Sequence, residues 1–218
     1  MPTLTVQEDV YVLDIGDTEN RFSPAWMVEM TDLLDQVVAA PKPLVATGTG
    51  KFYSNGLDLD WLSQNGAKFD SYVDQVHALY AKILTLPVPT ATAVNGHAFG
   101  AGAMLALAFD WRVMREDRGF FCLPEVDILI PFTDGMAALI QSKVTARTAV
   151  DAMTTGARFS GADALTAGIV DGVAGESDLL AAASAKVAHL QGKDPATLGK
   201  IKTTMFAPAV AALAPKAG

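Results

Sequence analysis

The sequence predicts an α/β fold in a single domain. Short apolar runs rich in β-branched residues alternate with longer segments whose apolar residues recur at helical spacing. Two stretches rich in glycine and small residues, 53–59 and 95–103, stand where a strand-like run passes into a helix-like one. The chain has 218 residues, half of them apolar, which is enough to build one hydrophobic core.

The N-terminal half shows the clearest alternation of strands and helices. Ser23 and Pro24 supply an N-cap and a first helical residue, so a helix is predicted from there to about Ala39. A longer helix is predicted over 70–86. The predicted strands of this half are 4–8, 10–15, 44–47 and 90–94, and the first two are expected to pair.

The C-terminal half is richer in alanine and in helical patterns. The segment 100–108 is small and apolar enough for a buried helix. Further helices are predicted at 146–155, at 161–167, from Gly175 to about Leu190 and, more weakly, from Pro195; further strands are predicted at 111–114, 120–123 and 169–173. We therefore expect a core over 1–174 and a C-terminal helical segment over 175–218 that packs on the body or on a partner subunit.

The charge balance and the cysteine content exclude several classes of protein. The chain has 24 acidic and 16 basic side chains, a net charge of −8, and no dense block of Lys and Arg. Nucleic acids and anionic membranes bind basic patches, so neither is expected as the main partner. No apolar run approaches the ~20 residues that a spanning helix needs, so no membrane insertion is expected. Cys122 is the single cysteine, which excludes a disulfide framework and favours a reducing, cytoplasmic compartment; within its apolar run it is expected to be a core residue.

Several common catalytic and ligand-binding motifs are incomplete. The segment 48–52 is similar to a phosphate-binding loop, but Val45 stands at the position of its first glycine and Phe52 where Ser or Thr binds magnesium. The three histidines lack the spacing of a metal pair or a catalytic triad, and no Gly-x-Ser-x-Gly elbow is present. We expect no metal site, and we expect His97 to pack or hydrogen-bond locally.

Three segments, 44–62, 87–110 and 120–131, together resemble the crotonase, or enoyl-CoA hydratase/isomerase, superfamily. The shared feature is the order of strand, glycine turn and helix, repeated once and followed by Pro124-Glu125. Within them, 54–59 and the adjoining segment 114–120 look most like the Δ3,Δ2-enoyl-CoA isomerases, particularly those of plant type. The resemblance implies a spiral of repeated β-β-α units with a short C-terminal helical segment, an acyl-CoA thioester as substrate, and a homotrimer or a dimer of trimers.

The resemblance also implies where the substrate binds. The thioester oxygen would accept hydrogen bonds from the backbone amides of Leu57 and Ala101, and small residues beside them would let the backbone approach the ligand. The residues implied to bind substrate and CoA are Ser54, Asn55, Gly56, Leu57, Asp58, Leu59, Gly100, Ala101, Met104 and Pro124. Coenzyme A is then part of the substrate, and no separate cofactor is implied.

The number of carboxylates favours one reaction of this superfamily. Its hydratases use two glutamates; here Met104 stands at the first position and Glu125 at the second. Methionine can neither take nor give a proton. An isomerase needs only one carboxylate, because the base that removes a proton from C2 of a 3-enoyl-CoA can return it at C4. We therefore predict Δ3,Δ2-enoyl-CoA isomerisation, with Glu125 as the base and the amides of Leu57 and Ala101 as the oxyanion donors.

Burial is expected to raise the pKa of Glu125, through the apolar neighbours Met104, Phe121, Leu123 and Val126. In the alternative reading of the residues, Glu125 only occupies a helix N-terminus after Pro124.

Other functions and a second acid also remain open. Asp127 and Asp134 are nearby candidates for a second acid, although Asp134 is expected to cap the following helix. The alternative functions are a non-catalytic acyl-CoA binding or carrier protein, or another crotonase reaction such as hydration, hydrolysis or decarboxylation.

Overall fold

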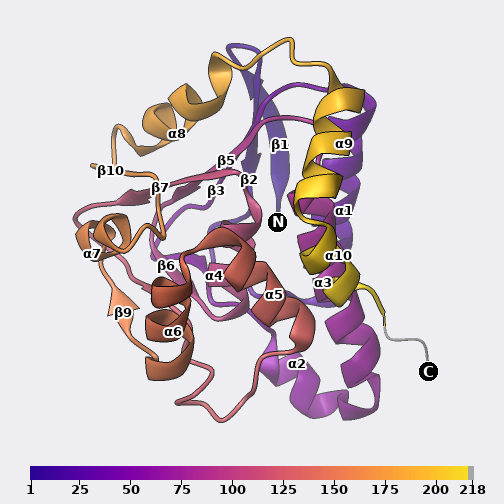
Figure 1. Ribbon diagram of the computed structural model, residues 1–218, viewed down its shortest axis with the longest axis vertical. Coiled ribbons are helices and arrows are strands. Elements are labelled where there is room, and N and C mark those ends of the chain that lie inside the picture. The colour runs from indigo at the N-terminus through magenta and orange to yellow at the C-terminus, as the bar shows by residue number, and fades with distance from the viewer. Residues whose placement is uncertain (216–218) are drawn as a thin grey trace.

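The computed structural model describes residues 1–215 and confirms the α/β class (Figure 1). One sheet has six strands, which in spatial order are β1 (Thr3–Gln7), β2 (Val10–Asp14), β3 (Leu44–Thr47), β5 (Thr90–Val94), β7 (Trp111–Arg115) and β10 (Gly172–Ala174). A smaller sheet has the order β4 (Phe52–Ser54), β6 (His97–Phe99), β8 (Phe121–Cys122) and β9 (Arg158–Phe159). The β1/β2 and β8/β9 pairs are antiparallel, and the other pairs are parallel.

The chain alternates between the two sheets, which gives the predicted spiral of β-β-α units. Strand β3 in the large sheet is followed by β4 in the small one, β5 by β6, and β7 by β8. The helices that follow these pairs are α2 (Leu59–Gln64) with α3 (Phe69–Leu84), then α4 (Ala101–Ala108), then α5 (Asp134–Lys143). Because β4, β6 and β8 are parallel neighbours, the segments that follow them leave the same edge of the small sheet.

Helices cover the sheets and fill the centre. Ser23 caps α1 (Pro24–Ala39) as predicted, its side chain accepting a hydrogen bond from the amide of Trp26. All eight residues of α4 are buried, which explains their small, uniformly apolar character. The remaining helices are a short 3₁₀ turn (Gly66–Lys68), α6 (Ala146–Thr155), α7 (Gly161–Thr166), α8 (Leu179–Ala188), α9 (Pro195–Met205) and α10 (Ala207–Leu213).

The C-terminal helices pack on the body of the same chain. Helix α8 lies on the large sheet, and α10 lies against α3 and α5 (Figure 1). Lys202 of α9 is buried, and its Nζ donates to the carbonyl of Val88 at 2.7 Å and to Asp110 Oδ2 at 2.5 Å. The predicted boundary between 1–174 and 175–218 stays a prediction, and its last three residues lie outside the described residues.

Some predicted element boundaries were wrong. Residues 169 and 170 belong to the core without forming a strand, and β10 begins at Gly172. The cap of α5 is Thr133, whose hydroxyl accepts from the amide of Met136, whereas Asp134 is the first helical residue. Strands β4, β6 and β9 were not predicted, because they have only two or three residues and show no alternating pattern; β8 is as short, but it lies within the predicted strand at 120–123.

Candidate active site

A cavity of about 350 Å³ opens at the edge where β4, β6 and β8 end. It is mostly apolar, which suits an acyl chain, and carries few polar groups. The residues that line it are Arg21, Asn55, Leu57, Leu59, Asp60, Phe69, Val73, Phe99, Gly100, Ala101, Met104, Pro124, Glu125, Ile128, Ile130, Pro131, Thr133 and Met136.

Most of the residues predicted to form the site line this cavity, and three are not part of its lining. The lining includes Asn55, Leu57, Leu59, Gly100, Ala101, Met104, Pro124 and Glu125. Ser54, by contrast, is fully buried, and its hydroxyl donates to the Asn20 carbonyl at 2.7 Å and accepts from the Gly56 amide at 3.1 Å. Asp58 caps α2 by accepting from the amide of Trp61 at 3.0 Å. Ser54, Gly56 and Asp58 therefore shape the loop.

The two glycine turns are in direct contact at Gly56. This residue has φ +80°, and a Cβ added to it would stand 2.9 Å from the amide nitrogen of Ala101 and 2.8 Å from the carbonyl oxygen of Phe99. Such separations leave no room for a side chain. The amide of Ala101 therefore lies beside the residue that precedes Leu57, which brings the two predicted donors to one place.

The amides of Leu57 and Ala101 point away from the hydrogen bonds that the preceding carbonyl groups accept. The Gly56 carbonyl accepts from the amide of Phe22 at 2.9 Å, and the Gly100 carbonyl accepts from that of Met104 at 3.1 Å. In a planar trans peptide the N–H points opposite to the C=O, so the next amides, of Leu57 and Ala101, face the other way. Within residues 1–215 neither donates to an acceptor. Ala101 opens α4, where such free N–H groups are expected.

Glu125 places a buried carboxyl group beside these turns. The residue is 7% exposed, and its Oε2 has no hydrogen-bond partner among the described residues. Its Oε1 lies 3.3 Å from the point that a Cβ on Gly100 would occupy. Burial raises the pKa of Glu125 to about 7, which confirms the predicted direction. A carboxyl with this pKa can take up and release a proton near neutral pH.

The surroundings of Glu125 differ from the prediction in two respects. Phe121, Leu123 and Met104 are buried as expected, but Val126 is 46% exposed. The segment after Pro124 forms turns rather than a helix, so Glu125 does not occupy a helix N-terminus.

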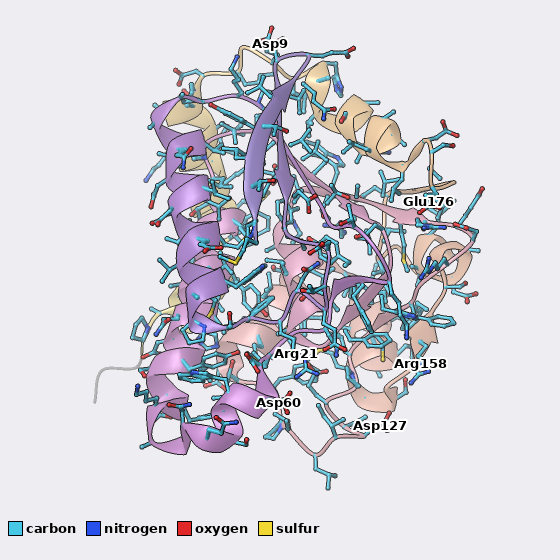
Figure 2. All side chains as sticks on the ribbon, turned by 180° about the vertical axis from the view of Figure 1, so that it is seen from behind. Asp9, Arg21, Asp60, Asp127, Arg158 and Glu176 are labelled. Atoms are coloured by element: carbon cyan, nitrogen blue, oxygen red, sulfur yellow. The ribbon has the colours of Figure 1, made fainter. Side chains whose placement is uncertain are left out.

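The other acidic side chains near the cavity are exposed. Asp60 stands at the rim and forms an ion pair with Arg21 at 2.5 Å, as the adjacent side chains in Figure 2 show. Asp127 and Asp134, the candidates for a second acid, are exposed and are not part of the lining. Among the described residues, Glu125 is thus the one buried carboxylate of this cavity.

His97 and Cys122 have the local packing roles predicted for them. The His97 ring in β6 packs between the rings of Phe52, Phe99 and Phe120, with centroids 5.0–5.7 Å away. Cys122 is buried. Over residues 1–215 no three His, Cys, Asp or Glu side chains form a group that could hold a metal ion, and no helix in that range is long and apolar enough to cross a membrane.

The sequence reasoning missed part of the cavity wall. Val73 belongs to the buried stripe of α3, which helical periodicity could have identified as core but not as cavity lining. Phe69, the first residue of this helix, is 48% exposed and lines the cavity all the same. Ile128 and Ile130 lie in an irregular segment, and no local pattern marks them. Arg21 lies before α1, and no sequence pattern marks it as a cavity residue.

Comparisons with known proteins identify the family and the fold. A profile of the family described as enoyl-CoA hydratase/isomerase matches residues 6–216. The peroxisomal enoyl-CoA delta isomerase 2 of Arabidopsis thaliana is 36% identical over 189 residues, which cover 82% of this chain and 79% of that protein. A probable enoyl-CoA hydratase of Bacillus subtilis is 30% identical over 211 residues, covering 94% and 81%. The crystal structure of human mitochondrial delta3-delta2-enoyl-CoA isomerase has a TM-score of 0.88 at 22% identity, covering 96% and 84%, and shows a shared fold.

Proposed function

The chain belongs to the enoyl-CoA hydratase/isomerase family, and on this premise we propose that it is a Δ3,Δ2-enoyl-CoA isomerase. The reaction moves the double bond of an acyl-CoA thioester from C3 to C2. One observation carries the proposal: a single buried carboxylate, Glu125, faces an apolar cavity beside two unpaired backbone amides.

The amides of Leu57 and Ala101 would bind the thioester oxygen. A proton on C2 of a thioester is too weakly acidic for a carboxylate unless the enolate oxygen is stabilised as it forms. Preorganised N–H donors supply that stabilisation, and losing one such donor typically costs about 3 kcal/mol in the transition state. The acyl chain would lie along the apolar wall that includes Val73, Met104 and Met136.

Glu125 would then move one proton along the carbon skeleton. Its carboxylate removes a proton from C2, and the electron pair of that C–H bond delocalises over the C3–C4 double bond and the thioester oxygen. The protonated Glu125 returns the proton to C4, which leaves the double bond between C2 and C3. The base is restored, and no water or other reactant is consumed.

Met104 supports isomerisation over hydration. Hydration adds water across the double bond, which calls for a second group to hold and activate that water. Met104 is 1% exposed and lines the cavity, but a thioether cannot exchange a proton. The delta isomerases of Arabidopsis are also more similar to this chain than the probable hydratase of Bacillus subtilis is.

Two substrates separate this reaction from its alternatives. Incubation with 3-hexenoyl-CoA should generate the conjugated 2-enoyl thioester, which is followed by its ultraviolet absorbance. With 2-hexenoyl-CoA, a hydratase would remove that absorbance by adding water, whereas an isomerase would leave most of it. A protein that binds both thioesters and converts neither would be a carrier, and the proposal would fail.

Assembly and compartment stay predictions that rest on the family resemblance and on composition. A homotrimer, or a dimer of trimers, is expected, and sedimentation velocity on the purified protein measures it. The cytoplasmic location likewise stays a prediction; the Arabidopsis relative named above is described as peroxisomal. No cofactor beyond the CoA portion of the substrate is proposed.

A further inference from the structure

We propose that Tyr72 and Tyr80 are positioning residues that hold the amides of Leu57 and Ala101 in a fixed relation to each other. Both tyrosines belong to α3, and each hydroxyl bonds to one of the two loops that carry the amides. The inference rests on the proposed function, since it assigns to one helix the alignment of the oxyanion donors.

Tyr80 fixes the loop that carries Ala101. Its side chain is fully buried, and its hydroxyl donates to the carbonyl oxygen of Ala101 at 2.8 Å. The N-cap of α4 is Gly100, which offers no side-chain hydrogen bond, and the helix itself is entirely apolar. Among the described residues, the Tyr80 hydroxyl is therefore the side-chain group that hydrogen-bonds to the first turn of α4, and it does so at Ala101, which lines the cavity.

Tyr72 fixes the loop that carries Leu57. Its hydroxyl accepts from the amide of Asp58 at 2.9 Å and donates to the carbonyl of Phe22 at 2.8 Å. The amide of Phe22 in turn donates to the carbonyl of Gly56 at 2.9 Å. The peptides before and after Leu57 are thus both tied to Phe22, one directly and one through the phenol. This arrangement sets the direction of the Leu57 amide from both sides.

A single rigid helix connects the two contacts. The two tyrosines are eight positions apart, which corresponds to about 12 Å along a helix. Both lie on the buried side of α3, which packs against α1 and α4. Burial raises the pKa of Tyr72 to about 12 and that of Tyr80 well above its usual value, so both phenols keep their protons at neutral pH.

Removal of either hydroxyl should lower kcat more than it changes KM. The negative charge on the thioester oxygen develops in the transition state, so a misdirected amide weakens the transition state more than the bound substrate. We expect Y72F and Y80F each to lower kcat for 3-hexenoyl-CoA about tenfold or more, with KM within about twofold, because small misplacements of reacting groups have effects of this size. The double variant Y72F/Y80F should lose more than either single variant.

Tyr53→Phe provides the matched control. Tyr53 is also fully buried, but its hydroxyl accepts from the hydroxyl of Thr92 at 3.0 Å and bonds to neither loop. This variant loses a buried hydrogen bond of similar kind and should keep its kcat. Thermal unfolding of all three single variants shows whether their losses of stability are comparable, which separates misalignment of the amides from a general loosening of the core.

A spectroscopic probe measures how strongly the two amides polarise the carbonyl of a bound thioester. Bound 2,4-hexadienoyl-CoA, whose conjugated thioester absorbs in the ultraviolet, should shift to longer wavelength when two amides polarise its carbonyl. We expect the shift in wild type and Y53F, a smaller shift in Y72F and Y80F, and the smallest in the double variant.

The outcomes distinguish this inference from the proposed function. Equal shifts and equal kcat in all variants, with an active wild type, would overturn the role of the tyrosines and leave the isomerase assignment in place. A wild type that binds the probe without a shift and does not convert 3-hexenoyl-CoA would overturn both.

Discussion

The Oε1 atom of Glu125 lies 3.3 Å from the point where a Cβ on Gly100 would stand, so the carboxylate lies against the turn that presents the amide of Ala101. Gly100 has φ +52°, and any side chain there would meet both backbone strain and the carboxyl group. The proposed base therefore lies against the turn that carries one of the two proposed oxyanion donors, and the approach is tight for a side chain at position 100.

The rate should depend on the ionisation of Glu125. Burial raises the pKa of this group to about 7, and only the carboxylate can remove a proton from C2. The kcat/KM for 3-hexenoyl-CoA should rise with pH through about 7 and level off above it, falling roughly tenfold per pH unit on the acidic side.

In Glu125→Gln, turnover should be lost at every pH while acyl-CoA still binds, as calorimetric titration would show. An unchanged rate in this variant would refute the assignment of the base.

The same carboxyl group should lower the stability of the protein at alkaline pH. Between pH 4.5 and about 7 the native state keeps a proton that the unfolded state releases, so the free energy of unfolding falls as pH rises through this window. Above it the loss is complete. Glu125→Gln, which carries no charge, should therefore be more stable than wild type at pH 8, by about 3 kcal/mol, and about equally stable at pH 4. Urea unfolding at both pH values measures the difference; equal stabilities at pH 8 would show that the carboxyl is not desolvated.

The contact between the two glycine turns can be tested at Gly56. Gly56→Ala introduces a Cβ 2.9 Å from the amide nitrogen of Ala101 and should push the two turns apart. Gly168→Ala is the matched control, because Gly168 also has a positive φ, +70°, but no atom lies within 4 Å of its added Cβ. Both variants should lose about 1–2 kcal/mol from backbone strain. The Gly56 variant should lose about 1–3 kcal/mol more from overlap, together with its kcat. Equal unfolding free energies and rates in the two variants would argue against a close approach of the turns.

A carboxylate introduced at position 104 should make Glu125 harder to ionise. Met104 and Glu125 line the same cavity, and two like charges in one apolar site disfavour ionisation of both. In Met104→Glu the acidic limb of the pH–rate profile should therefore move to higher pH. Met104→Gln places a side chain of similar shape without the charge and should leave the limb near pH 7. The profiles of the two variants, measured side by side, would coincide if residue 104 did not face the base.

The fold was predictable to the extent that each element carried enough residues to show a period. Helix α1 and strands β3 and β5 lie where their patterns place them. Strands β4 and β6 have three residues each and are defined by pairing across the chain, which no local pattern reports. These two missed strands are also the ones that bring the site together, because with the predicted strand at 120–123 they place the glycine turns and Glu125 at one edge of the small sheet.

The candidate site was predictable where chemistry depends on residue type. The family resemblance supplied positions 104 and 125, and because only certain side chains transfer protons, the residue types there favoured Glu125 over Met104 as the base. Ser54 and Asp58 carry polar groups that a sequence offers equally to ligand or backbone, and here both bond to backbone. Tyr72 and Tyr80 look like ordinary members of a buried helical stripe, and only their hydrogen bonds relate them to the loops.

The most direct test of the single-base account is the fate of the proton that Glu125 removes. In 3-hexenoyl-CoA labelled with deuterium at C2 and converted in ordinary water, a buried carboxyl that carries the label from C2 to C4 should produce 2-hexenoyl-CoA with deuterium at C4, detected by mass spectrometry and NMR. The slow exchange this requires is consistent with the burial of Glu125, whose Oε2 has no partner among the described residues. A product whose C4 hydrogen comes entirely from water would contradict the account.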